Sequence, residues 1–198
     1  EKKDRPGRKL LMTGNGRCNI SNSADIRSYP ENYFGNGKFL YKALHAFSPS
    51  DLRLFFDACG VRLKEEDGGR LFPVSDQAED VLRALAKRAE QLGVEFHPEE
   101  PVTDIRTGRD GRVAGVVTAR GIYNIDACIV TTGGSSWPGT GSTGDGYRMA
   151  ARLGHEIVPL RAGLAPVDST EAAEQSLQGV ALRNAGLRVY WDTSELAI

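Results

Sequence analysis

Apolar residues recur at helical spacing in three stretches of the first half of the chain. We expect a short helix within residues 36–47, a second helix over residues 49–59 and a longer one over residues 76–92. Residues 5–30 are rich in Gly, Arg, Asn and Ser and have little periodicity, which predicts an ordered loop. Residues 61–65 alternate weakly between apolar and polar, which predicts a short strand.

Capping residues mark the ends of these helices. Ser48 followed by Pro49 is typical of a helix start, and Gly60 would end that helix. Ser75 is the predicted N-cap of the long helix, which Gly93 would close. Five apolar positions of the long helix fall on one face and should pack against a core: Val81, Leu82, Leu85, Ala89 and Leu92.

After residue 93 the pattern becomes that of short β-strands. Four are expected, with a hairpin turn at Asp110-Gly111: residues 94–96, 101–106, 113–119 and 123–126. Residues 127–131 are apolar and β-branched, as in a strand buried within a sheet. A glycine-dense loop follows, and then a helix from about Asp145 to Leu153 that Gly154 would close.

The character of the chain changes again near its end. Residues 168–175 are acidic and polar, and residues 182–191 alternate like a strand. We therefore expect a boundary at residues 163–168. It would separate one domain, residues 1–165, from the beginning of a β-rich module, residues 166–198.

Composition narrows the class of protein. The 198 residues include 25 Lys+Arg and 26 Asp+Glu, and 40% are hydrophobic, which favours a globular core and excludes the strongly basic footprint of a nucleic-acid binder. Apolar runs are too short to cross a bilayer, and the charged start is unlike a signal peptide. Three widely spaced cysteines fit reduced thiols, which predicts a cytoplasmic protein without a disulfide framework or zinc site.

Three glycine-rich segments carry the candidate chemistry. In the first, residues 7–19, Gly14 and Gly16 would expose backbone amides and Arg17 would add a charged fork, which together could cradle a phosphate or pyrophosphate. A plain surface loop explains the same glycines. The second segment, residues 131–136, follows a predicted strand, and strand ends are where open α/β sheets bind ligands. Many strand ends, however, carry a Gly-Gly turn.

The third segment, residues 139–147, leads into a predicted helix whose free amides could meet a ligand. Asp145 there would be either the N-cap of that helix or an acceptor for a polar ligand edge. No Gly-Lys-Ser/Thr follows the glycines, which argues against a P-loop NTPase.

Taken together, three segments resemble one family of flavoproteins. They are GRKLLMTGNGRCNISN from Gly7, FPVSDQAEDVLRAL from Phe72 and TTGGSSWPGTGSTGDGYRMAARLGH from Thr131. The chain is similar over essentially its whole length to the HI0933-like FAD-dependent oxidoreductases, also described as aminoacetone-oxidase-like or bile-acid-reductase-like.

This resemblance implies an α/β fold: a partial Rossmann-like FAD-binding domain followed by the start of an inserted β-rich substrate domain. The GxGxxG unit would precede Glu1 and a C-terminal part would follow, in a protein about twice as long. FAD would carry hydride between NAD(P)H and a small organic substrate, without a nucleic-acid or membrane partner. The alternatives are a non-catalytic FAD-binding module and an inactive truncated fragment.

The resemblance also implies roles for individual residues. Glu1 would hold the adenosine ribose, and Val102 would offer its backbone to the adenine. The pyrophosphate and flavin side would be lined by Arg8, Lys9, Gly14, Gly16, Arg17, Cys18 and Asn19, and by Thr132, Gly133, Gly134, Thr143, Gly144 and Asp145. Asn15 replaces a usual glycine, and we expect the loop to keep its shape because Asn tolerates positive φ. No catalytic residue is identified, and the three scattered histidines form no metal-binding pattern.

Overall fold

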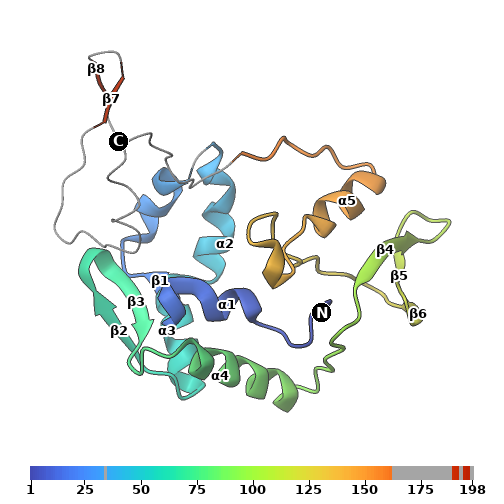
Figure 1. Cartoon of the computed structure of the whole chain (residues 1–198), viewed down its shortest axis with the longest axis horizontal. Helices are drawn as coiled ribbons and strands as arrows, with labels where there is room; N and C mark the ends of the chain where they lie inside the picture. Colours follow the sequence, from blue (N-terminus) through green and yellow to red (C-terminus); the bar gives the residue numbers. More distant parts are fainter. Residues whose placement is uncertain (34, 162–188, 192–193, 197–198) are drawn as a thin grey trace, which may run out of the picture. The chain divides into compact units, whose positions relative to one another are not determined.

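The computed structural model describes residues 1–33, 35–161, 189–191 and 194–196 (Figure 1). The chain forms two compact units, Glu1–Ile157 and Val158–Ile198. In the second unit β7 (Val189–Trp191) pairs antiparallel with β8 (Ser194–Leu196). The predicted strand over residues 182–191 is thus seen only in its last part. The rest of it, the acidic segment and the predicted boundary lie outside the described residues.

The start of the chain is more regular than expected. The predicted loop over residues 5–30 contains helix α1 (Arg8–Met12), the short strand β1 (Ser21–Asn22) and 3-10 turns. Leu10 and Leu11 of α1 pack on the hydrophobic core, and α1 lies against α4. A helix this short is stabilised mainly by burial against other elements. Because it has fewer than two turns, its sequence is too short to show a helical period of apolar residues.

The next helices follow the predicted pattern. A 3-10 helix over Gly37–Leu40 continues into α2 (Tyr41–Ala46), and α3 spans Pro49–Ala58. Ser48 caps α3 as predicted, because its hydroxyl accepts a hydrogen bond from the Asp51 amide while the Asp51 carboxylate accepts one from the Ser48 amide. This reciprocal capping satisfies amides that would otherwise have no partner.

Helix α4 (Ala78–Gln91) begins two residues later than predicted, and Gln77 takes the N-cap position instead of Ser75. Asp76 cannot be helical because it adopts a left-handed conformation with φ 56°, and its carboxylate is held by Lys64 and Arg17. The expectation that Leu92 packs against the core is also wrong, since 64% of its surface is exposed beyond the helix end.

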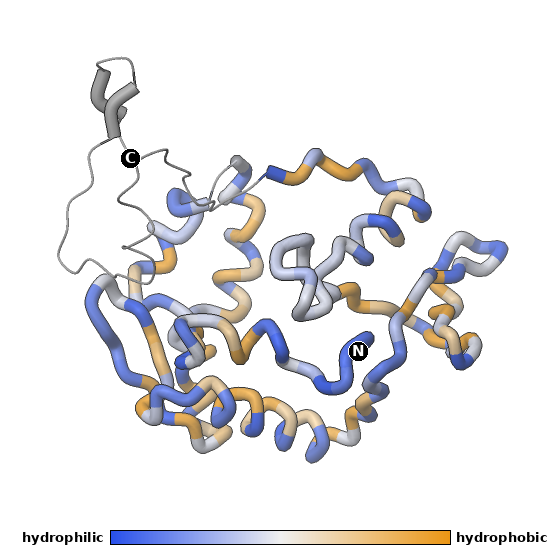
Figure 2. Tube along the Cα trace, viewed as in Figure 1, coloured by the Kyte–Doolittle hydropathy of each residue, from blue (hydrophilic) through white to orange (hydrophobic). Residues whose placement is uncertain are grey.

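The core of the first unit lies among α1, α3 and α4. Its buried members are Cys18, Phe56, Val61, Ala78 and Val81. Figure 2 shows apolar and polar positions alternating along α4, as expected of a helix with one face on a core. Strands β2 (Leu63–Glu66) and β3 (Arg70–Pro73) pair antiparallel beside it, and β1 pairs with the other edge of β3.

A second antiparallel sheet has the order β4–β5–β6, formed by Val102–Thr107, Val113–Thr118 and Gly121–Asn124. The predicted hairpin at Asp110-Gly111 is therefore confirmed. Glu100 lies just before β4 with only 3% of its surface exposed, and its carboxylate accepts hydrogen bonds from Thr118 and Tyr123. These bonds and the nearby Arg120 guanidinium keep the pKa of Glu100 below its ordinary value.

Two predicted strands are not formed. Residues 94–96 and 127–131 are irregular, and Ile129 is 87% exposed. A strand exists only where a neighbouring strand completes its hydrogen bonds, and none of the described strands pairs with either segment. The prediction of a buried strand at 127–131 was therefore wrong for this structure, although its apolar character stands out in Figure 2. Among the described residues, no helix combines the length and apolarity needed to span a bilayer.

Candidate functional site

Two of the three glycine-rich segments are joined to each other. Helix α5 (Asp145–Arg152) starts after Gly144, whose amide donates to the Gly134 carbonyl at 3.0 Å. The Gly146 amide donates to Thr132 Oγ1 at 3.1 Å. Gly144 is the N-cap of α5, so the alternative of Asp145 as a simple N-cap is wrong. The start of α5 is thus bound directly to residues 132–134.

Glycines allow the close approach at this junction. A Cβ on Gly146 would lie 2.6 Å from Thr132 Oγ1, and one on Gly133 would lie 2.9 Å from Ser142 Oγ. None of the amides of residues 132–136 donates a hydrogen bond to another described residue. The junction therefore leaves a run of amide donors available for an acceptor such as a phosphate or a carbonyl oxygen.

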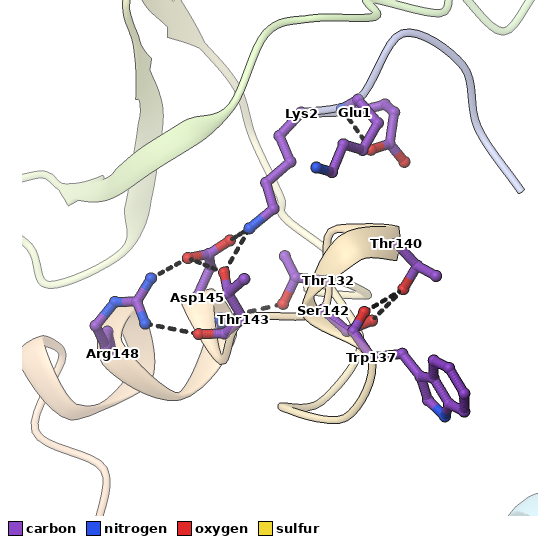
Figure 3. Close-up of polar contacts among 11 residues, drawn as sticks. Glu1, Lys2, Thr132, Trp137, Thr140, Ser142, Thr143, Asp145 and Arg148 are labelled. Atoms are coloured by element: carbon purple, nitrogen blue, oxygen red, sulfur yellow. Dashed lines mark hydrogen bonds and ion pairs between the residues drawn. The ribbon is translucent and has the colours of Figure 1, made fainter. Parts of the chain in front are cut away.

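Charged groups surround Asp145 at the start of α5 (Figure 3). Lys2 Nζ lies 2.5 Å from Asp145 Oδ2 and 2.5 Å from Thr143 Oγ1, and Arg148 pairs with the same carboxylate. Lys2 above all holds the pKa of Asp145 below its ordinary value. Lys2 was not among the predicted site residues, because a lysine in a charged run at the start of the chain carries no signal of a contact 143 positions away.

The two residues predicted on the adenosine side are also brought together. The Glu1 carbonyl accepts a hydrogen bond from the Glu100 amide at 2.9 Å, and Val102 begins β4 two residues further on. The Glu1 carboxylate accepts a hydrogen bond from the Lys3 amide at 2.8 Å.

The first glycine-rich segment bends as the sequence predicts. Gly14, Asn15 and Gly16 all have positive φ, so Asn15 does occupy a left-handed position in place of glycine. A Cβ on Gly14 would lie 2.9 Å from the Asn19 amide nitrogen. Cys18 is left-handed too, with φ 62°, and only 5% of its surface is exposed. Burial raises the pKa of its thiol, which favours a packed, unreactive cysteine.

Arg17 is engaged by carboxylates of the protein itself. Its guanidinium donates to both oxygens of Glu66, at 2.8 and 3.1 Å, and to Asp76 at 3.1 Å. Lys64 completes the group through ion pairs with the same two carboxylates. The four side chains balance in charge, so the positive fork expected for a pyrophosphate is neutralised within the loop's own surroundings. Arg17 holds the pKa of Glu66 low, and Lys64 holds that of Asp76 low.

The two basic residues of α1 have different partners. Arg8 pairs with Asp4 at 2.8 Å. Lys9 Nζ lies 3.3 Å from both the carbonyl and the hydroxyl oxygen of Ser136. Lys9 is therefore the side chain that connects the first glycine-rich segment to the second.

The predicted site residues thus fall into three groups, and Arg8, paired with Asp4, belongs to none of them. The first, which we call the loop junction, consists of Thr132, Gly133, Gly134, Thr143, Gly144 and Asp145. From the start of the chain, Lys2 bonds to the loop junction and Lys9 bonds to Ser136, two residues after Gly134. The second group is Glu1 and Val102, which lie together beside Glu100. Glu1 is also the sequence neighbour of Lys2. The third group lies in the bend of the first glycine-rich segment: Gly14, Gly16, Arg17, Cys18 and Asn19. Arg17 bonds to β2, Gly14 lies beside Phe72 of β3, and Cys18 is buried in the core. Within the described ranges, no set of three or more His, Cys, Asp and Glu side chains could hold a metal ion.

Free amides, flexible glycines and lysines suit an elongated ligand that carries negative charge in its middle. FAD is such a ligand, and the residues of the loop junction and of the Glu1–Val102 region fit it in chemical type.

Comparison with known proteins agrees with this fit. Residues 1–185 match the HI0933-like protein Rossmann domain. The chain is 30% identical over 178 residues to a ribosomal RNA dihydrouridine synthase of Escherichia coli K12, covering 89% of this chain and 43% of that protein. It is 32% identical over 161 residues to a 3-dehydro-bile acid delta(4,6)-reductase of Clostridium scindens, covering 81% and 38%. The chain thus spans less than half the length of these curated relatives.

A solved structure gives the same picture of the fold. The open conformation of a flavocytochrome c3 fumarate reductase superposes with a TM-score of 0.50 and 18% identity, over 76% of this chain and 32% of that one. The match of the family domain covers most of the sequence, and it agrees with the glycine-rich segments and their joined geometry. The chain belongs to the HI0933-like flavoprotein family, and its fold class is that of the family's Rossmann-like domain.

Proposed function

We propose that the protein containing this chain is an FAD-dependent oxidoreductase that moves hydride between NAD(P)H and an organic substrate. The observation that carries the proposal is the loop junction, where residues 132–136 keep their amides free and α5 begins. Membership of a flavoprotein family and a relative named as a reductase support it.

The described residues would bind and orient the cofactor. Glu1 and Val102 would hold the adenosine, while Lys9 and the loop junction would face the pyrophosphate and flavin. Arg17 would act indirectly, because its bonds to Glu66 and Asp76 fix the bend at residues 13–19. Bound FAD would supply the hydride chemistry, so the protein needs no covalent nucleophile.

We further propose that the substrate carries an electron-poor carbon–carbon double bond. The names of both kinds of relative point to reduction of such a bond. Dihydrouridine is uridine with its ring carbon–carbon double bond reduced, and the other relative is named as a delta(4,6)-reductase of a bile acid. Reduction adds a hydride to one carbon of the bond and a proton to the other. The balanced charge of this chain favours a small molecule over RNA, and the pattern of cysteines favours a cytoplasmic location.

The test is spectroscopic and uses the full-length protein. Flavin absorbance at about 450 nm that is bleached anaerobically by NADH or NADPH supports an oxidoreductase. A yellow protein that neither nucleotide bleaches supports a non-catalytic FAD-binding module, and a protein that is colourless and binds no added FAD contradicts the proposal.

The substrate class is tested with the reduced enzyme. Conjugated enones and a uridine-containing RNA are offered separately, and reoxidation of the flavin is followed together with the mass of the product. A gain of two hydrogens in the enone supports a small-molecule substrate. The same gain in RNA alone contradicts our expectation that the protein has no nucleic-acid partner.

A further inference from the structure

Lys2 and Lys3 are adjacent lysines with different surroundings. The Lys2 ammonium contacts Asp145 Oδ2 and Thr143 Oγ1, each at 2.5 Å, and 23% of its side chain is exposed. The Lys3 ammonium has no hydrogen bond or ion pair with any other described residue. Figure 3 shows the Lys2 ammonium bonded to the loop junction. The carbon stem of Lys3 lies beside Gly141, but its equally charged ammonium makes no such bond.

The backbone on both sides of Lys2 is fixed by hydrogen bonds to residues 99 and 100. The Glu1 carbonyl accepts from the Glu100 amide at 2.9 Å, and the Lys3 carbonyl accepts from the Glu99 amide at 2.8 Å. These bonds hold residues 1–3 against residues 99–100, directly before β4. The Lys2 side chain therefore links the segment that contains Glu1 to the loop junction.

Lys2 also sets the charge of the junction. Lys2 and Arg148 are both paired with the single carboxylate of Asp145, so the three groups sum to one positive charge. Without the Lys2 ammonium, Asp145 and Arg148 would sum to zero. The lowered pKa of Asp145 agrees with this pairing, because a bonded cation favours the ionised carboxylate.

We propose that Lys2 is a positioning residue for FAD, which ties the Glu1 segment to the loop junction and keeps that junction positively charged. The inference rests on the proposed function. In this inference Lys2 has two roles: it links two segments, and its positive charge favours a cofactor that gains negative charge on reduction.

The experiment compares variants of the full-length protein by two readouts: the dissociation constant of FAD, from titration of the apoprotein, and the midpoint potential of the bound flavin. Lys2→Met should weaken FAD binding by about tenfold and lower the potential, because the loop junction, which would face the flavin, loses its net positive charge. Lys3→Met is the matched control: it removes the same charge at the adjacent residue and should change the dissociation constant by less than about twofold. Lys2→Arg should bind FAD nearly as the wild type does.

A charge-rescue variant separates the electrostatic task from packing. In Lys2→Met/Asp145→Asn the junction again sums to one positive charge, through Arg148 alone. The double variant should therefore recover most of the potential lost in Lys2→Met, which a purely structural role would not allow. Circular dichroism of each apoprotein checks that the variants are folded, and Lys2→Arg tests the lysine position if Lys2→Met is not.

The outcomes are distinct. If the wild type binds FAD and is bleached by NADH or NADPH, but Lys2→Met and Lys3→Met behave alike, the inference is wrong and the proposed function stands. Failure of the double variant to recover the potential also overturns the electrostatic task. A wild-type protein that binds no FAD overturns the proposed function, and the inference with it.

Discussion

Arg17 and Glu66 form a two-pronged ion pair, in which the guanidinium donates to both carboxylate oxygens at 2.8 and 3.1 Å. The same guanidinium lies over the ring of Phe72, 4.0 Å from its centre. Because Arg17 ends the bend at residues 13–16 and Glu66 ends β2, this pair fixes the first glycine-rich segment onto the small sheet. The stability of the segment should therefore depend on ionised carboxylates.

Acid should weaken this part of the molecule. The pKa of Glu66 is lowered from 4.5 by Arg17, and that of Asp76 is lowered from 3.8 by Lys64. A lowered pKa contributes stability above the unfolded value and loses it as the pH falls through the folded value. Glu66→Gln should lower the free energy of unfolding at neutral pH and make its decline below pH 4.5 shallower. Urea unfolding at a series of pH values measures both effects.

Glu65→Gln is the matched control for that experiment. Glu65 is the exposed neighbour of Glu66 on β2 and has no ion pair with another described residue. Its substitution should leave the pH dependence unchanged. Equal effects at the two positions would show that the Arg17 pair contributes nothing specific.

Cys18 should be the least reactive of the three thiols in this chain. It is buried and its pKa is raised, whereas Cys59 and Cys128 are half-exposed. Because the thiolate is the reacting species, iodoacetamide should alkylate native Cys18 at least about tenfold more slowly than Cys59. Peptide mass spectrometry after timed quenching measures the rates, and all three thiols should react alike in denaturant. Fast labelling of native Cys18 would instead favour a redox-active cysteine in the bend.

The backbone at Asn15 should select strongly among substitutions. With φ 57°, the position suits Gly and Asn and is strained for β-branched residues. We expect Asn15→Gly to be neutral or stabilising, and Asn15→Val to destabilise by about 1–3 kcal/mol. Chemical denaturation of the two variants beside Asn15→Ala, which should fall between them, measures the order. Equal stability of the Gly and Val variants would contradict a left-handed residue here.

Gly146 should tolerate no side chain. An added Cβ would lie 2.6 Å from Thr132 Oγ1 and 3.1 Å from Val130 Cγ1, and would push α5 away from residues 130–132. We expect Gly146→Ala to destabilise by about 1–3 kcal/mol and to weaken FAD binding. Gly139→Ala is the control, because nothing lies within 4 Å of its Cβ. Thermal unfolding and FAD titration should both be close to wild type for the control, and a Gly146→Ala variant that matches it would argue against the close junction.

Elements whose signals are local were predictable from the sequence. The Ser48–Pro49 start of α3, the Asp110-Gly111 hairpin and the extent of α5 each depend on a few consecutive residues, and the structure agrees within about two residues of each end. Helix α1 and the start of α4 were missed because packing and the Asp76 contacts decide them. The predicted strands at 94–96 and 127–131 show why a local pattern alone does not make a strand, since the pairing partner is also required.

The same division applies to the candidate site. The amino-acid sequence by itself determined where the chain can bend, because glycines and Asn15 permit backbone conformations that other residues avoid, and such preferences act on each residue separately. Only the tertiary structure decided that Lys2 meets Asp145, that Lys9 meets Ser136 and that Arg17 is occupied by Glu66. Long charged side chains can pair with any opposite charge within reach, and which charges come within reach is set by the packing of distant segments.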